Sequence, residues 1–146
     1  MAQFFHRLHS IPLDTLPRDR DWKPYFKYDK NAKMNQCGDV FLHGDVNYSN
    51  FLVDDDYNLH AVFDWDPACV GPRLAEFCTF VYCRDLEMLP LVLGEYNKLA
   101  KTRITPMQVV KHQLARKEDK NPNEILAEAK KLFAKSSPTP QSLPKK

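Results

Sequence analysis

Glycine is scarce in this chain, at 4 of 146 residues, where average usage near 7% would give about ten. The four lie far apart, at Gly38, Gly44, Gly71 and Gly94. Glycine-rich loops hold phosphates because neighbouring glycines let several backbone amides approach the ligand closely. The spacing here excludes such a loop within this chain.

Two further patterns are missing. The cysteines, at positions 37, 69, 78 and 83, form no C-x-x-C pair, so the sequence gives little support to a zinc site. No apolar run approaches the length of about 18 residues that indicates a membrane-spanning helix, and no signal peptide is recognisable at Met1. We therefore expect a soluble, cytoplasmic protein with no membrane partner and with reduced, mostly buried thiols.

The distribution of charge is uneven along the chain. Residues 1–96 hold 9 basic and 15 acidic side chains, whereas residues 97–146 hold 12 basic and 4 acidic ones. A basic segment can bind nucleic acid or an anionic membrane. Lysine-rich, solvated helix faces account for the same pattern, and we therefore expect no nucleic-acid partner.

Apolar spacing along the chain predicts an α+β fold that is mostly helical. The last turns of a helix are expected near residues 4–9, a strand at 40–42, and a hairpin of strands at 51–53 and 59–64. Helical spacing follows at 74–82 and 89–100, and capping boxes at 105–108 and 121–124 begin two more helices. We expect one lobe over residues 1–135 and a disordered tail over 136–146, which carries three prolines.

Three oxygen-bearing residues stand out between the strands: Asp45, Asn50 and Asp64. The first two lie on one short loop, and the hairpin brings the third back toward them, because paired strands lie about 5 Å apart. Phosphoryl transfer needs a base at the attacking hydroxyl and Mg²⁺ held by a few oxygens. Each residue alone is an ordinary turn former, but the combination favours phosphoryl transfer.

The segment H-G-D-V-N-Y-S-N at 43–50 resembles the H-G-D-x-x-x-x-N catalytic loop of the aminoglycoside phosphotransferase and choline kinase-like superfamily, which is protein-kinase-like. The segments F-L-V at 51–53 and F-D-W at 63–65 resemble the family's following hairpin. Further similarity lies in A-C-V-G-P-R at 68–73 with Glu76, and in L-H-S-I-P-L at 8–13. The resemblance covers roughly residues 4–100 and implies the C-terminal catalytic lobe of a kinase-like fold, with a short hairpin packed among helices.

This resemblance implies specific roles. Asp45 would be the catalytic base, and Asn50 and Asp64 would hold Mg²⁺, with ATP as co-substrate. Asn47 would contact the phosphate or the substrate. His43 would brace the loop, and Glu76 would tie the following helix to it.

Two alternatives concern neighbouring aspartates. Asp54, Asp56 and Asn58 imitate the start of a calcium-binding EF-hand loop, but Leu59 and Trp65 stand where that loop needs glycine and glutamate. A hairpin turn therefore explains this stretch better. Asp66 is either an additional ligand beside Asp64 or a turn residue before Pro67.

Members of the resembled family also have an N-terminal lobe that covers ATP, and nothing before His43 supplies one. We therefore expect this chain to be the catalytic portion of a longer ATP-dependent O-phosphotransferase, with the N-terminal lobe as a partner and weak MgATP binding on its own. The acceptor would be the hydroxyl of a small molecule: an aminoglycoside, a sugar or an amino alcohol. The alternative is an inactive, truncated remnant or interaction module that keeps the lobe fold.

Overall fold

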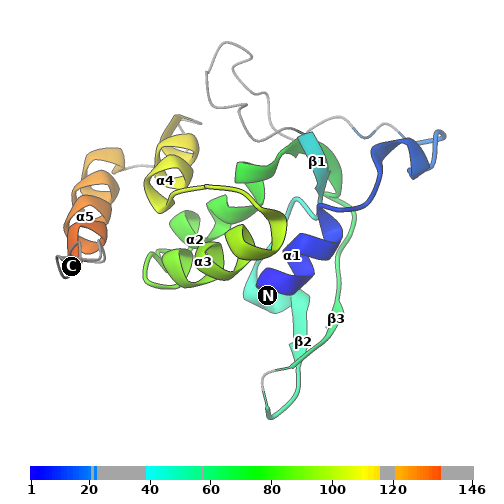
Figure 1. Ribbon diagram of the computed structural model, residues 1–146, viewed down its shortest axis with the longest axis horizontal. Coiled ribbons are helices and arrows are strands. Elements are labelled where there is room, and N and C mark those ends of the chain that lie inside the picture. The colour runs from blue at the N-terminus through cyan, green and yellow to red at the C-terminus, as the bar shows by residue number, and fades with distance from the viewer. Residues whose placement is uncertain (21, 23–38, 57, 116–120, 136–146) are drawn as a thin grey trace, which may run out of the picture.

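The computed structural model describes residues 1–20, 22, 39–56, 58–115 and 121–135. Two small antiparallel sheets and a larger set of helices form the described part (Figure 1). One sheet pairs β1 (Asp39–Leu42) with β4 (Cys69–Pro72), and the other pairs β2 (Phe51–Val53) with β3 (Leu59–Val62). The predicted α+β, mostly helical class is confirmed at this level.

Helices precede and follow the strands. The α-helices are α1 (Ala2–Leu8), α2 (Cys78–Tyr82), α3 (Met88–Ala100), α4 (Pro106–Ala115) and α5 (Pro122–Lys135). Short 3₁₀ turns are η1 (Leu13–Thr15), η3 (Tyr48–Asn50) and η4 (Arg73–Phe77). None of the helices in the described ranges is long and apolar enough to cross a membrane.

The start of α4 shows why the sequence placed this helix correctly. The Thr105 backbone amide donates to Gln108 Oε1 over 2.7 Å, and the Gln108 amide donates back to Thr105 Oγ1 over 3.3 Å. This reciprocal pair fixes the first turn of the helix, and the Gln108 amide also donates to the Thr105 carbonyl over 3.0 Å. Pro106 occupies the first helical position, where a missing N–H does no harm.

The structure corrects two details of the sequence prediction. Residues 69–72 form β4, which was not predicted; they pair with β1 about 30 residues earlier, so local patterning carries little sign of the strand. The hairpin's second strand ends at Val62 rather than at residue 64. The helical spacing predicted over 74–82 is realised as the 3₁₀ turn η4 followed by α2, at whose end Tyr82 is 71% exposed. The predicted tail, 136–146, lies outside the described residues.

A single apolar cluster joins the helices. The cluster includes Phe5 of α1, Phe77 of η4, Leu93 of α3, Val109 of α4 and Ile125 of α5, all at most 1% exposed. The β2–β3 hairpin extends away from this cluster (Figure 1), and Leu52 and Val53 on it are about half exposed. The loop between β1 and β2 therefore lies between the helical body and the hairpin.

Candidate active site

The loop after β1 turns sharply at Gly44. This glycine has φ of +85°, in the left-handed region that side chains other than glycine rarely adopt. A Cβ at this position would lie 2.3 Å from the carbonyl oxygen of Pro67. Glycine is therefore required both by the backbone conformation and by the close approach of a second segment.

His43 is fully buried and fixed at both ring nitrogens. Its Nε2 lies 2.8 Å from the Phe63 carbonyl oxygen, which can only accept, so Nε2 carries the hydrogen. The Asp45 backbone amide donates to Nδ1 over 3.3 Å. The Trp65 ring packs edge-on against the imidazole, 4.6 Å between centroids. These contacts occupy the ring and leave it no free nitrogen for a reaction.

The Asp45 carboxylate is oriented by two side-chain amides. Asn47 Nδ2 and Asn50 Nδ2 donate to the same oxygen, Oδ2, over 3.1 Å and 3.2 Å. No hydrogen bond from the described residues reaches the second oxygen, Oδ1, and Asp45 is only partly buried. The arrangement holds the carboxylate in one direction and leaves one oxygen able to accept a proton.

Asn47 performs two structural tasks in the loop. Its Oδ1 accepts from the Ser49 backbone amide over 2.9 Å and so caps the 3₁₀ turn η3. Its amide nitrogen donates to Asp45, as described above. The phosphate or substrate contact expected for Asn47 stays a prediction, and one amide hydrogen remains to make it.

Asn50 and Asp64 meet through the backbone of Phe63. The Phe63 amide donates to the Asn50 carbonyl over 2.9 Å, while its carbonyl accepts from His43. Asp64 follows directly, with φ of +57°, and its carboxylate is exposed without a hydrogen bond from the described residues. The structure thus brings the hairpin's end to the loop 43–50, as the sequence predicted, and Asn50 connects it to Asp45.

The donor set at Asn50 and Asp64 fits Mg²⁺. Asn50 Nδ2 bonds both the Asp45 carbonyl, over 2.9 Å, and the Asp45 carboxylate, so the amide oxygen faces the other way and receives only a long 3.4 Å contact from Ser49. Magnesium takes one or two carboxylates and leaves its other positions to water and phosphate. No group of three or more His, Cys, Asp or Glu side chains suited to a metal occurs among the described residues. Asn50 and Asp64 would therefore hold the ion together with water and phosphate oxygens.

Glu76 holds the loop from behind. This residue is only 3% exposed. Its Oε2 accepts from the His43 backbone amide over 2.8 Å, and its Oε1 accepts from the Gly44 amide over 3.2 Å. Two amide bonds compensate part of the cost of burying a carboxylate. Glu76 therefore connects η4 to the loop immediately before Asp45, in the place where the sequence predicted such a tie.

Sequence reasoning missed a second group of residues behind Glu76, namely His9, Arg73 and Tyr96. His9 Nε2 lies 3.5 Å from Glu76 Oε2, and His9 Nδ1 lies 2.7 Å from the Tyr96 hydroxyl. Burial lowers the pKa of His9 below its usual 6.5, although the neighbouring carboxylate acts in the opposite direction. A polar residue on the buried face shared by Phe5 and Leu8 was the available signal.

The aspartates that raised alternatives lie in turns. Asp54 accepts from the backbone amides of Asp56 and Asn58 over 3.0 Å and 2.8 Å, and these and further hydrogen bonds, chiefly from Asn58, lower its pKa. This geometry closes the predicted hairpin turn. Asp66 lies between Trp65 and Ala68, where the Ala68 amide donates to the Trp65 carbonyl over 3.0 Å.

A pocket borders the loop beside η3. It is lined by Met1, Val46, Asn47, Tyr48, Phe51, Thr79, Phe80 and Cys83. Partial burial and the adjacent Asp85 carboxylate, to which the hydroxyl donates, raise the pKa of Tyr48 to about 12. The lining residues carry amide, hydroxyl and thiol groups, and two of them, Tyr48 and Asn47, donate to the carboxylates of Asp85 and Asp45.

Comparison with models of known protein families gives a match. Residues 2–100 match the sequence profile of the APH group, described as the phosphotransferase enzyme family. The searches of curated proteins and of solved structures return no match. The matched segment extends from α1 to the end of α3 and includes the whole candidate site. Because it covers more than half of the chain, the protein belongs to the phosphotransferase enzyme family.

Proposed function

We propose that this chain forms the base and metal-binding part of an ATP-dependent O-phosphotransferase, with the fold of a kinase-like C-terminal lobe. Family membership supports phosphotransferase activity in general terms. One observation carries the more specific proposal: two amides hold Asp45 Oδ2 and leave Oδ1 without a partner from the described residues. A fixed carboxylate with one open oxygen is suited to accept a proton from a bound alcohol.

In the proposed reaction, the acceptor's hydroxyl oxygen bonds to the γ-phosphorus of ATP while its proton passes to Asp45 Oδ1. The bond between that phosphorus and the bridging oxygen of ADP breaks, so a phosphate ester and ADP leave. Mg²⁺, when bound, neutralises charge on the phosphates. Asn50 Oδ1 and the Asp64 carboxylate would hold it, and Asn47 would use its remaining amide hydrogen on a phosphate oxygen.

The acceptor in this proposal is a small hydroxylated molecule. An aminoglycoside, a sugar and an amino alcohol all supply the hydroxyl. Residues after 97 are rich in lysine and arginine. This basic segment favours a sugar or amino alcohol over a polycation, because a polycation is bound most tightly by an acidic surface.

The test compares Asp45→Asn with a matched control, Asp56→Asn. Asp56 lies exposed in the hairpin turn, so its substitution removes the same charge away from the loop. Transfer of labelled phosphate from ATP to a panel of sugars, amino alcohols and aminoglycosides is measured with Mg²⁺. We expect Asp45→Asn to lower turnover by roughly 10²- to 10⁴-fold, the usual contribution of a general base, and Asp56→Asn to leave it unchanged.

A second measurement does not depend on turnover. Mn²⁺, a paramagnetic substitute for Mg²⁺, should broaden the backbone NMR signals of Asn50 and Asp64 first, and Asp64→Asn should abolish that selectivity. Turnover that survives Asp45→Asn would contradict the assigned role of this residue. Absence of turnover on every acceptor together with absence of selective broadening would overturn the proposed function.

A further inference from the structure

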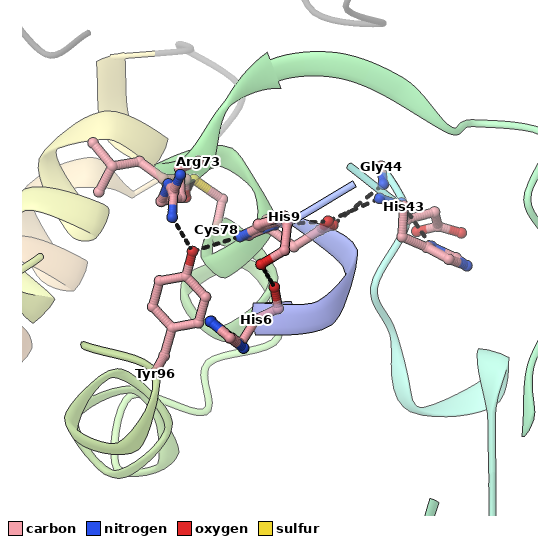
Figure 2. Close-up of polar contacts among 11 residues, drawn as sticks. His6, His9, His43, Gly44, Arg73, Cys78 and Tyr96 are labelled. Carbon is pink, nitrogen blue, oxygen red and sulfur yellow. Dashed lines mark hydrogen bonds and ion pairs between the residues drawn. The ribbon is translucent and has the colours of Figure 1, made fainter. Parts of the chain in front are cut away.

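A buried polar cluster lies directly behind the catalytic loop and joins α1, η4 and α3. Figure 2 shows His9 between the Tyr96 hydroxyl and the Glu76 carboxylate. That carboxylate accepts from the backbone amides of His43 and Gly44. His9 is 6% exposed and Tyr96 is fully buried. Polar groups with so little access to water depend on one another for hydrogen bonds, so their donor and acceptor roles can be worked out.

The direction of each hydrogen bond follows from Glu76. Its Oε2 accepts from the His43 amide and lies 3.5 Å from His9 Nε2, and a carboxylate can only accept, so the hydrogen of the neutral imidazole belongs on Nε2. Nδ1, 2.7 Å from the Tyr96 oxygen, is then the acceptor, and the phenolic hydrogen is directed at it. Arg73 Nη1, which can only donate, bonds to the same phenolic oxygen over 2.8 Å. Burial favours this neutral form, because it lowers the pKa of His9.

The Nε2 hydrogen faces Glu76, whose Oε2 is 3.5 Å away. That carboxylate is buried and already accepts the amides of His43 and Gly44. A positive ring edge beside it stabilises the charge, whereas the other tautomer would direct a lone pair at the carboxylate. Other charged or titratable groups near His9 are Arg73 and His6, and both act against protonation of its ring.

We propose that Tyr96 and His9 are positioning residues for Asp45: the Tyr96 hydroxyl keeps His9 in the Nε2–H tautomer, and His9 thereby stabilises the Glu76 carboxylate that holds the two loop amides before Asp45. This inference rests on the proposed function for its consequence in catalysis. Its structural part concerns only the chain's own hydrogen bonds. The loop is thus anchored by side chains from two helices that themselves contact neither Asp45 nor the metal-binding pair.

The first experiment needs no variant. In the full chain, ¹⁵N NMR of the histidine rings distinguishes a protonated Nε2 from a protonated Nδ1. We expect His9 to show a protonated Nε2 and an unprotonated Nδ1 at neutral pH. A His9 ring with the hydrogen on Nδ1 would overturn the proposal, whatever the enzyme's activity.

The second experiment uses Tyr96→Phe, which removes only the hydroxyl, with Tyr82→Phe as the matched control on an exposed ring. We expect hydrogen exchange at the His43 and Gly44 amides to accelerate about tenfold in Tyr96→Phe, the ratio for a lost interaction near 1.4 kcal/mol. Tyr82→Phe should leave both rates unchanged. Where the chain turns over, Tyr96→Phe should lower kcat more than it raises the KM for ATP.

The outcomes separate this inference from the proposed function. Unchanged exchange at both loop amides in folded Tyr96→Phe would refute the positioning role even if Asp45→Asn abolished activity. Should Tyr96→Phe fail to fold, His9→Gln takes its place, because the Gln amide can present an N–H to Glu76. Retention of slow exchange in His9→Gln and its loss in His9→Leu supports the proposal, and equal exchange in the two contradicts it.

Discussion

Substitution of Gly44 by alanine tests the geometry of the loop most directly. Residue 44 combines φ of +85° with a hypothetical Cβ only 2.3 Å from the Pro67 carbonyl oxygen. A left-handed conformation costs an alanine about 1–2 kcal/mol. The clash is with a backbone atom, so relieving it requires movement of the Pro67 segment, at about 1–3 kcal/mol for an overpacked site. We expect Gly44→Ala to lower the free energy of unfolding by about 2–5 kcal/mol, a large part of the 5–15 kcal/mol of a typical domain.

Gly94 provides a matched control of opposite sign. It lies exposed within α3, and a Cβ there would have no atom within 4 Å. Alanine in a helix interior is more stable than glycine by about 0.5–1 kcal/mol. Gly94→Ala should therefore stabilise the protein while Gly44→Ala destabilises it.

Urea unfolding followed by far-UV circular dichroism measures both effects. The free energy of unfolding depends linearly on urea concentration, and extrapolation to zero urea gives each variant's stability. Equal slopes show that the variants expose the same surface area on unfolding. A Gly44→Ala protein with the midpoint of the parent would refute the loop geometry. So would a Gly94→Ala protein destabilised as strongly as Gly44→Ala, because the loss would then not depend on the position.

Two further predictions concern pH and helix capping. The folded-state pKa of His9 lies below 6.5, so the unfolded chain binds a proton more readily as the pH falls through 6.5, and the free energy of unfolding should decrease there. Urea unfolding at several pH values should show a smaller decrease for His9→Gln than for the parent. An equal dependence of the unfolding free energy on pH in the two proteins would contradict the burial argument. Thr105→Ala removes the hydroxyl that accepts from Gln108 at the start of α4 and should cost about 0.5–2 kcal/mol, whereas Thr105→Ser should restore most of it in the same assay.

Much of the site's layout could be predicted because its residues are close in sequence. Asp45 and Asn50 lie on one loop. The hairpin that follows has a short turn, so its second strand brings Asp64 back to the start of its first strand, beside Asn50. The pattern of apolar residues predicted the hairpin and the later helices for the same reason, because these elements form between residues that are close in sequence. The catalytic and metal-binding roles of these residues stay predictions that the proposed experiments test.

The sequence by itself determined the elements that depend on neighbours within a few residues: the capping box at Thr105, the Asp54 turn and the loop 43–50. Tertiary structure alone decided the contacts between distant segments. Residues 39–42 pair with residues 69–72 in one sheet, and Gly44 packs against the Pro67 carbonyl. His9 forms a hydrogen bond with Tyr96, 87 positions later in the chain. Local propensity carries no information about such pairs, because their stability arises only when packing brings the segments together and removes their polar groups from water.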